Sequence, residues 1–95
     1  MRLTDFEIQT QSKLVKGEPM RFNNKYLIPI FKNDIKIIGR SQNMIWAEVS
    51  PKGFILVEKK RSWYIPIDKK HMRVTTLVEK IPKMRKLLNE LKKKL

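Results

Sequence analysis

The residues best suited to chemistry in this sequence are basic and aromatic, and they indicate binding of a polyanion. Lys59, Lys60 and Arg61 are consecutive, and Trp63 and Tyr64 follow closely. In an exposed turn, adjacent cations can neutralise backbone phosphates while neighbouring rings stack on bases. We therefore expect this turn to contact the backbone of DNA or RNA.

Four further residues extend this candidate site. Lys69 and Lys70 add positive charge just after the aromatic pair, and the predicted turns place Lys36 and Trp46 in one cross-strand row with Tyr64. Residues paired across strands lie on one face of a sheet. Such a row resembles the stacking platform of single-strand binders. The alternative is that the N-terminal segment covers this face as a second small core.

The distribution of charge supports a polyanionic partner. The chain has 22 Lys and Arg against 9 Asp and Glu, a formal net charge of +13. Residues 1–50 carry +3 and residues 51–95 carry +10. A charge of this size in half a small domain creates a strong local field. The alternative is a Lys-rich surface that maintains solubility, as in thermophile proteins.

Catalytic and metal-binding patterns are weak. His71 is the one histidine and follows two lysines, which is typical of a solvated surface. Glu79 and Glu90 precede Lys83 and Lys94 by four residues, the spacing of helix salt bridges. The three glycines are isolated, so they form no phosphate-binding loop. We expect a non-enzymatic protein without cofactor or metal.

The length of the chain limits it to one small domain. At 95 residues, about 65% of the unfolded surface can be buried, so residues 1–95 form one core. Cysteine is absent, which excludes disulfides and thiol nucleophiles. No apolar run reaches 10 residues and no signal-peptide pattern is present, so we expect a cytoplasmic protein without membrane contact.

Short apolar runs separated by turn residues predict a sheet. The runs recur every 9–10 residues, which is typical of a five-stranded antiparallel meander, either a curled sheet or a small barrel; they cover residues 26–31, 35–38, 44–49, 54–59 and 63–67. Asn33-Asp34, Gly39–Asn43, Ser50–Gly53 and Lys60-Arg61 are the expected turns, and Arg21–Phe22 adds a sixth short strand. Prolines within 26–30 and 63–67 favour edge positions for both strands.

The turn positions also predict which side chains form the core. In this register the core face holds Ile28, Ile30, Ile35, Ile37, Ile45, Ala47, Val49, Phe54, Leu56, Trp63, Ile65 and Ile67. A shift of one residue would move a strand's apolar set to the opposite face.

The C-terminal pattern predicts a helix over residues 81–94, with Pro82 in its first turn. Its apolar stripe consists of Met84, Leu88, Leu91 and Leu95. Packing against the protein's own sheet is one interpretation, and pairing with another copy is the second. The edge strands offer another route to a homo-oligomer.

The N-terminal segment allows two interpretations. A capping box at Thr4 and Glu7, with a staple of Leu3 and Ile8, favours a helix over residues 4–16. Apolar and polar residues alternate over residues 6–14, which favours a strand. We adopt the helix.

These elements predict an α+β domain in which a curled sheet is packed by the C-terminal helix. Short strands with a tryptophan on one face and a Lys-rich C-terminal helix, in a chain without cysteine, make the outline similar to the small archaeal chromatin proteins. That resemblance implies an SH3-like barrel and sequence-independent binding of duplex DNA. The Ile- and Lys-rich composition also resembles that of small proteins from hyperthermophilic archaea. No motif matches residue by residue, so no functional residue is transferred.

Overall fold

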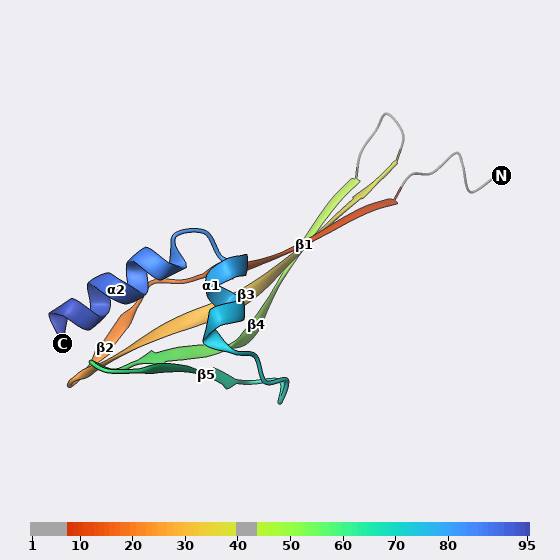
Figure 1. The fold of residues 1–95 in the computed structure, drawn as a ribbon. Helices are drawn as coiled ribbons and strands as arrows, with labels where there is room; N and C mark the ends of the chain where they lie inside the picture. Colours follow the sequence, from red (N-terminus) through yellow and green to blue (C-terminus); the bar gives the residue numbers. More distant parts are fainter. Residues whose placement is uncertain (1–7, 40–43) are drawn as a thin grey trace.

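A curled antiparallel sheet with two C-terminal helices on one face forms this α+β protein (Figure 1). The computed structural model describes residues 8–39 and 44–95. The elements are β1 (Ile8–Lys16), β2 (Met20–Phe22), β3 (Lys25–Ile38), β4 (Met44–Val57), β5 (Ser62–Pro66), α1 (Val74–Lys80) and α2 (Met84–Lys94). Within the described ranges, neither helix has the length and hydrophobicity that a membrane crossing requires.

Two strands of 14 residues, β3 and β4, form the axis of the molecule and extend over about 48 Å at ~3.4 Å per residue. The sheet order is β1-β3-β4-β5, and β2 pairs with β3 beyond the end of β1. The helices cover only part of this length. Residues 8–12, 34–38 and 44–49 project past them as a three-stranded ribbon, here called the arm (Figure 1).

A β-bulge stands where a turn was expected. Ser50–Gly53 lies inside β4, and the register with β3 shifts so that Ile30 faces Gly53 whereas Phe31 faces Pro51. Lys52 is the extra residue. Proline and glycine mark bulges as well as turns, because both disturb the regular ladder. The prediction of a hairpin here was therefore wrong.

The expected turn at Asn33-Asp34 was also wrong. Both residues lie within β3 and pair with β1 on one side and β4 on the other. Asp34 tolerates this position because the Ser12 hydroxyl donates a hydrogen bond to its carboxylate and Lys32 lies 3.7 Å away. Two expected hairpins thus merge into long strands, while the short strand at β2 and the pairing of Lys36 with Trp46 are confirmed.

The helix expected over residues 4–16 is replaced by β1, which pairs with β3 from Ile8 to Lys16. Alternation, rather than the capping pattern, indicated the correct structure here. Leu3, Thr4 and Glu7 lie outside the described residues. Pairing with β3 over nine residues outweighs the local helix signal, because tertiary contacts override intrinsic propensity.

The core lies between the helices and one face of the sheet, here called the inner face; the opposite face is the outer face. The buried strand residues are Tyr26, Ile28, Ile30, Ile55, Val57 and Tyr64, and the buried helical and linker residues are Leu77, Ile81, Met84, Leu88 and Leu91. The C-terminal stripe therefore packs against its own sheet. It is not available for the intermolecular pairing that was the alternative.

The predicted core face was wrong for most of its members. By strand register, Ile35, Phe54, Leu56, Trp63 and Ile65 lie on the outer face, away from the helices. Because residues 33–34 and 50–53 lie within strands and form no turns, the strand register differs from the expected one, and different residues share each face. In the body of the sheet both faces are apolar, so alternation alone did not indicate which face the helices would choose.

Pro82 lies between two helices and not in the first turn of one, so the expected helix start at residue 81 was wrong. α1 ends before Ile81, whose backbone is extended (φ −108°, ψ 117°), and α2 begins after Lys83, whose φ is 64°. A residue that precedes proline disfavours the helical region, and proline itself lacks the N–H that a continuous helix requires. Ile81 remains 2% exposed and connects the two helical parts of the core.

Pro29 shows how a central strand accommodates proline. The strand at Tyr26–Ile30 was predicted to be an edge, but β3 lies between β1 and β4. The Pro29 carbonyl accepts a 2.8 Å hydrogen bond from the Gly17 N–H. In an antiparallel ladder a residue's nitrogen and carbonyl point to the same side. The donorless nitrogen therefore faces the gap between β1 and β2. The second proline strand, β5, is an edge as predicted.

Candidate anion-binding cleft and aromatic arm

A cleft of about 670 Å³ opens where the helices end and the arm begins. Strands β1, β3 and β4, the segment after β5 and α1 with its C-terminal linker all contribute to its lining. Five lysines and one aspartate carry its formal charges: Lys13, Lys32, Lys52, Lys70, Lys80 and Asp68. Residues far apart in sequence thus give the cleft an excess of positive formal charge, beside the apolar side chains of Leu14, Val15 and Met72.

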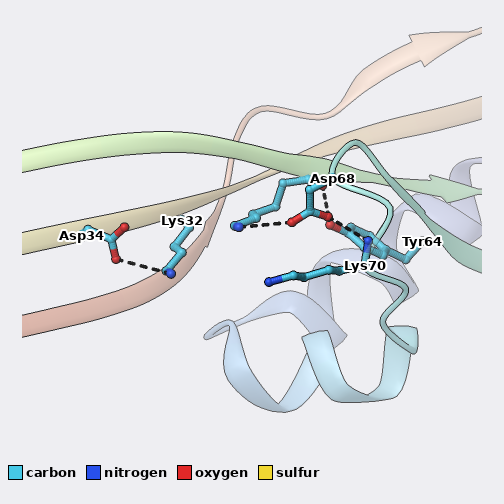
Figure 2. A network of polar contacts seen from close by, with 6 residues as sticks. Lys32, Asp34, Tyr64, Asp68 and Lys70 are labelled. Atoms are coloured by element: carbon cyan, nitrogen blue, oxygen red, sulfur yellow. Dashed lines mark hydrogen bonds and ion pairs between the residues drawn. The ribbon is translucent and has the colours of Figure 1, made fainter.

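Two carboxylates compensate part of this charge (Figure 2). Lys52 Nζ lies 3.2 Å from Asp68 Oδ2, and Lys32 Nζ lies 3.7 Å from Asp34 Oδ1. These are the two ion pairs found among residues 8–39 and 44–95. Lys70 forms none of them, although Figure 2 shows its side chain extending toward the space beside Lys32.

Asp68 is held as an anion by its surroundings. The backbone N–H of Lys70 donates a 3.1 Å hydrogen bond to its Oδ1. This bond, followed by the hydrogen bond from the Lys52 side chain, lowers the pKa of Asp68. An ionised Asp68 orders Lys52 but leaves Lys13, Lys70 and Lys80 without a carboxylate partner in the described part of the chain. Lys70 and Lys80 border the cleft from the helical side, whereas Lys13 pairs with Asn33 and borders it from the edge strand β1.

Tyr64 supports the cleft instead of stacking on a ligand. It is 3% exposed beneath the helices, and its hydroxyl donates a 2.7 Å hydrogen bond to the Lys52 carbonyl. Burial, and secondarily the negative charge of Asp68, raises the pKa of Tyr64. The predicted platform of Trp46 and Tyr64 is therefore not assembled.

Trp46 remains an exposed aromatic group, on the arm. It lies directly opposite Lys36, and its side chain is 60% exposed. Asp34 and Glu48 complete a shallow hollow beside this pair. Lys32 and Lys36 lie on the same face of β3 four residues apart, about 14 Å at the rise of a strand. Trp46 therefore lies on the same face of the sheet as Lys32 of the cleft, farther out along the arm.

The β4–β5 hairpin is present, but its connection spans residues 58–61 and not the expected two-residue Lys60-Arg61 turn, and it lies far from the arm. Lys59, Lys60 and Arg61 are exposed in the connection between β4 and β5, and the Arg61 guanidinium lies 4.8 Å from the centre of the Trp63 ring. Eleven residues of β4 separate Trp46 from Val57, about 37 Å. Lys69 is exposed near the cleft, with a φ of 64°. The predicted residues therefore fall into three groups along the molecule.

Four cleft lysines were missed from the sequence: Lys13, Lys32, Lys52 and Lys80. One signal was present, because Lys32 interrupts the alternating apolar pattern that contains Ile28 and Ile30. A charged residue in that pattern marks the point at which the covering helices stop. No sequence pattern indicated that Lys52 would line the cleft, because its orientation depends on the β-bulge in β4.

The described residues gather no set suited to metal binding: no group of three or more His, Cys, Asp or Glu comes together there. His71 is exposed in the segment before α1. The arrangement can attract and hold an anion and can offer one ring for stacking. No family model matches the chain, and no curated protein and no solved structure matches it either.

Proposed function

We propose that this protein is a non-enzymatic module that binds the phosphate backbone of nucleic acids. The observation that carries the proposal is the convergence of lysines from separate elements in one cleft, three of them without a carboxylate partner in the described structure. Nucleic acids carry one phosphate per nucleotide, and closely spaced lysines can bind several of these phosphates at once. Neutralising them releases condensed counterions, which favours binding at low salt.

Trp46 gives the proposal its second part. A backbone seated in the cleft could continue along the inner face of the arm past Lys36 to this ring. Aromatic stacking is tolerant of sequence because every base has a flat face. We therefore expect an unpaired base to stack on Trp46, with Lys36 near its phosphate and the cleft holding the adjoining backbone.

An acidic protein segment is the alternative partner, because carboxylates would also be attracted to the cleft. The exposed ring favours nucleic acid, since a purely electrostatic site for carboxylates has no need of a stacking surface. The two partners are distinguished by Trp46 fluorescence, which a stacked base quenches strongly.

The test compares two variants that each lose three positive charges. Lys13→Ala, Lys70→Ala and Lys80→Ala together remove the three cleft lysines that have no carboxylate partner and leave Lys32 and Lys52 in place. Lys83→Ala, Lys86→Ala and Lys93→Ala remove exposed charges from the helical side. Binding of a fluorescent 20-nucleotide DNA or RNA is followed by anisotropy over a range of salt concentrations. The cleft variant should reduce the salt slope by about 2.1 for a single strand. Equal loss in both variants would mean that only net charge matters, and would contradict a site at the cleft.

A further inference from the structure

The outer face of the sheet is apolar along most of its two long strands, β3 and β4. Lys25 at the start of β3 and Lys13 of β1, opposite Asn33, are charged residues at its margins. Apart from Lys25, every outer-facing residue of β3 and β4 outside the bulge is uncharged: Leu27, Pro29, Phe31, Asn33, Ile35, Ile37, Ile45, Ala47, Val49, Phe54 and Leu56. Asn33 is the one polar member of that set. The described helices both pack on the inner face, so none of the described elements covers this surface.

The pattern of the arm shows that this surface is built to be covered. On the arm, the inner face carries Asp34, Lys36 and Glu48, whereas the outer face carries Ile35, Ile37 and Ile45. Alternation of this kind is typical of a sheet with one solvated and one buried face. In the body, where the helices cover the inner face, both faces are apolar, as in strands buried on both sides. The feature common to both regions is an apolar outer face.

The exposure of individual side chains agrees with this. Val49 and Ile45 are 62% and 68% exposed, and Met20, Phe22 and Ile65 on flanking strands are also exposed. The face is about 48 Å long and ~10–14 Å wide between outer strand axes, or roughly 600 Å² before edge side chains are added. The area includes the polar β1 positions Gln9, Gln11 and Lys13. Its apolar part is comparable with the largest apolar patch of a typical monomer, and the whole face approaches the ~800 Å² that each partner contributes to a stable interface.

We propose that a second copy of the chain covers this face, so that the protein is a dimer of two sheets packed outer face to outer face. A net charge of +13 opposes association through the charged surfaces of the chain, whereas the strip of this face from Leu27 to Ile37 and from Ile45 to Leu56 is uncharged outside the bulge. An acidic partner would be drawn instead to the lysines of the inner side. In a dimer with two-fold symmetry, each outer face contacts the identical face of the other copy, so the two surfaces have the same length and width.

The dimer would have a consequence for the basic cleft. Facing sheets pack about 10 Å apart with their apolar side chains interdigitated. Both helical layers and both clefts would then lie on the outside, pointing in opposite directions. The proposal does not depend on nucleic-acid binding, because the apolar β3 and β4 positions that it covers carry none of the proposed phosphate contacts; Lys13 lies beside them on the edge strand β1.

The test is the mass in solution, measured by light scattering in 0.5 M salt without nucleic acid. We expect about twice the 11.4 kDa of the chain. Val49→Lys and Ile65→Lys, at exposed outer positions, should give the mass of one chain with an unchanged circular dichroism spectrum. Thr10→Lys adds the same charge to the inner face of the arm and should leave the dimer intact.

Two results would overturn the proposal. One is a single-chain mass for the unaltered protein at high concentration, and the other is a dimer that resists both outer-face substitutions. Salt provides an independent readout, because screening reduces the repulsion between two cationic chains. Dimerisation should therefore strengthen as salt rises, whereas backbone binding should weaken. A dimer that dissociates as salt rises would also contradict an apolar interface.

Discussion

The Tyr64 hydroxyl donates a 2.7 Å hydrogen bond to the carbonyl of Lys52, the extra residue of the bulge in β4. The same carbonyl accepts a 2.9 Å hydrogen bond from the Ile67 N–H. A buried ring thus connects the core to the point at which the sheet leaves the helices and becomes the arm. The bulge directs the Lys52 side chain into the cleft, where it meets Asp68.

Removing this hydroxyl should destabilise the protein by a moderate amount. Tyr64→Phe retains the packed ring and loses one hydrogen bond, for which we expect a loss of about 0.5–1.5 kcal/mol in the free energy of unfolding. The Lys52 carbonyl keeps its bond to Ile67, so it is not left without a donor. Urea denaturation at pH 7 measures the difference. A loss above about 3 kcal/mol would show that the hydroxyl holds more of the bulge than this single bond.

The raised pKa of Tyr64 should make the stability of the fold depend on pH in alkaline solution. Its folded pKa is raised by burial, so above pH ~10 the unfolded chain releases the phenolic proton more readily than the folded one. Stability should be unaffected by this group below pH ~10 and fall above it. Urea midpoints measured in alkaline buffers should fall less steeply in Tyr64→Phe than in the unaltered protein. Identical slopes would contradict the raised pKa.

Asp68 predicts the response to acid. Its folded pKa is lowered by the Lys70 N–H and then by Lys52, so its contribution to stability is present above its unfolded pKa near 4. That contribution is lost as pH falls through the folded pKa. Asp68→Asn should be less stable than the unaltered protein at pH 6 and should approach it in strong acid. A difference that stays constant with pH would contradict an ionised Asp68.

Trp46→Ala separates binding from stability. Because the side chain is 60% exposed, its removal should change the free energy of unfolding by about 0.5 kcal/mol or less. If a base stacks on the ring, single-strand affinity should fall by about 1–3 kcal/mol, or roughly 5- to 150-fold. Trp63→Phe removes the other tryptophan, so fluorescence then reports on Trp46 alone. Unquenched fluorescence with bound oligonucleotide would exclude stacking.

The hairpin tip is tested by replacing Lys59, Lys60 and Arg61 with alanine. All three are exposed, so stability should barely change. If the tip holds three phosphates, the salt slope should shrink by about 2.7 for duplex DNA. An unchanged affinity and slope would show that the tip is a solvated turn. The cleft would not be affected by that result, because the tip lies at the far end of β4.

The sequence predicted the fold class and several secondary-structure elements better than the register of the strands. The α+β class, the helical stripe and the pairing of Lys36 with Trp46 agree with the local periodicity. The expected turn at Gly39–Asn43 lies largely outside the described residues. Ser50–Gly53 and Asn33-Asp34 contain residues that favour turns, but both lie inside long strands because pairing with neighbours outweighs local preference. The arm was unexpected for this reason.

The site was predicted only in part, for a related reason. Lys70 was identified from its position in a basic run, whereas Lys13, Lys32 and Lys80 come together only through the tertiary fold. Tyr64 was assigned to the wrong environment because two apolar faces of one sheet look alike in sequence. Tertiary packing determines which face of the sheet contacts the helices, and the local periodicity of the sequence does not predict it.

The most direct test of the account is the salt dependence of nucleic-acid binding by the unaltered protein. Three lysines in the cleft and Lys36 on the arm provide about four phosphate contacts. The logarithm of the association constant for a 20-nucleotide single strand should therefore fall against the logarithm of salt concentration with a slope near −2.8. No binding at 50 mM salt, or an affinity that does not change with salt, would contradict backbone recognition by this protein.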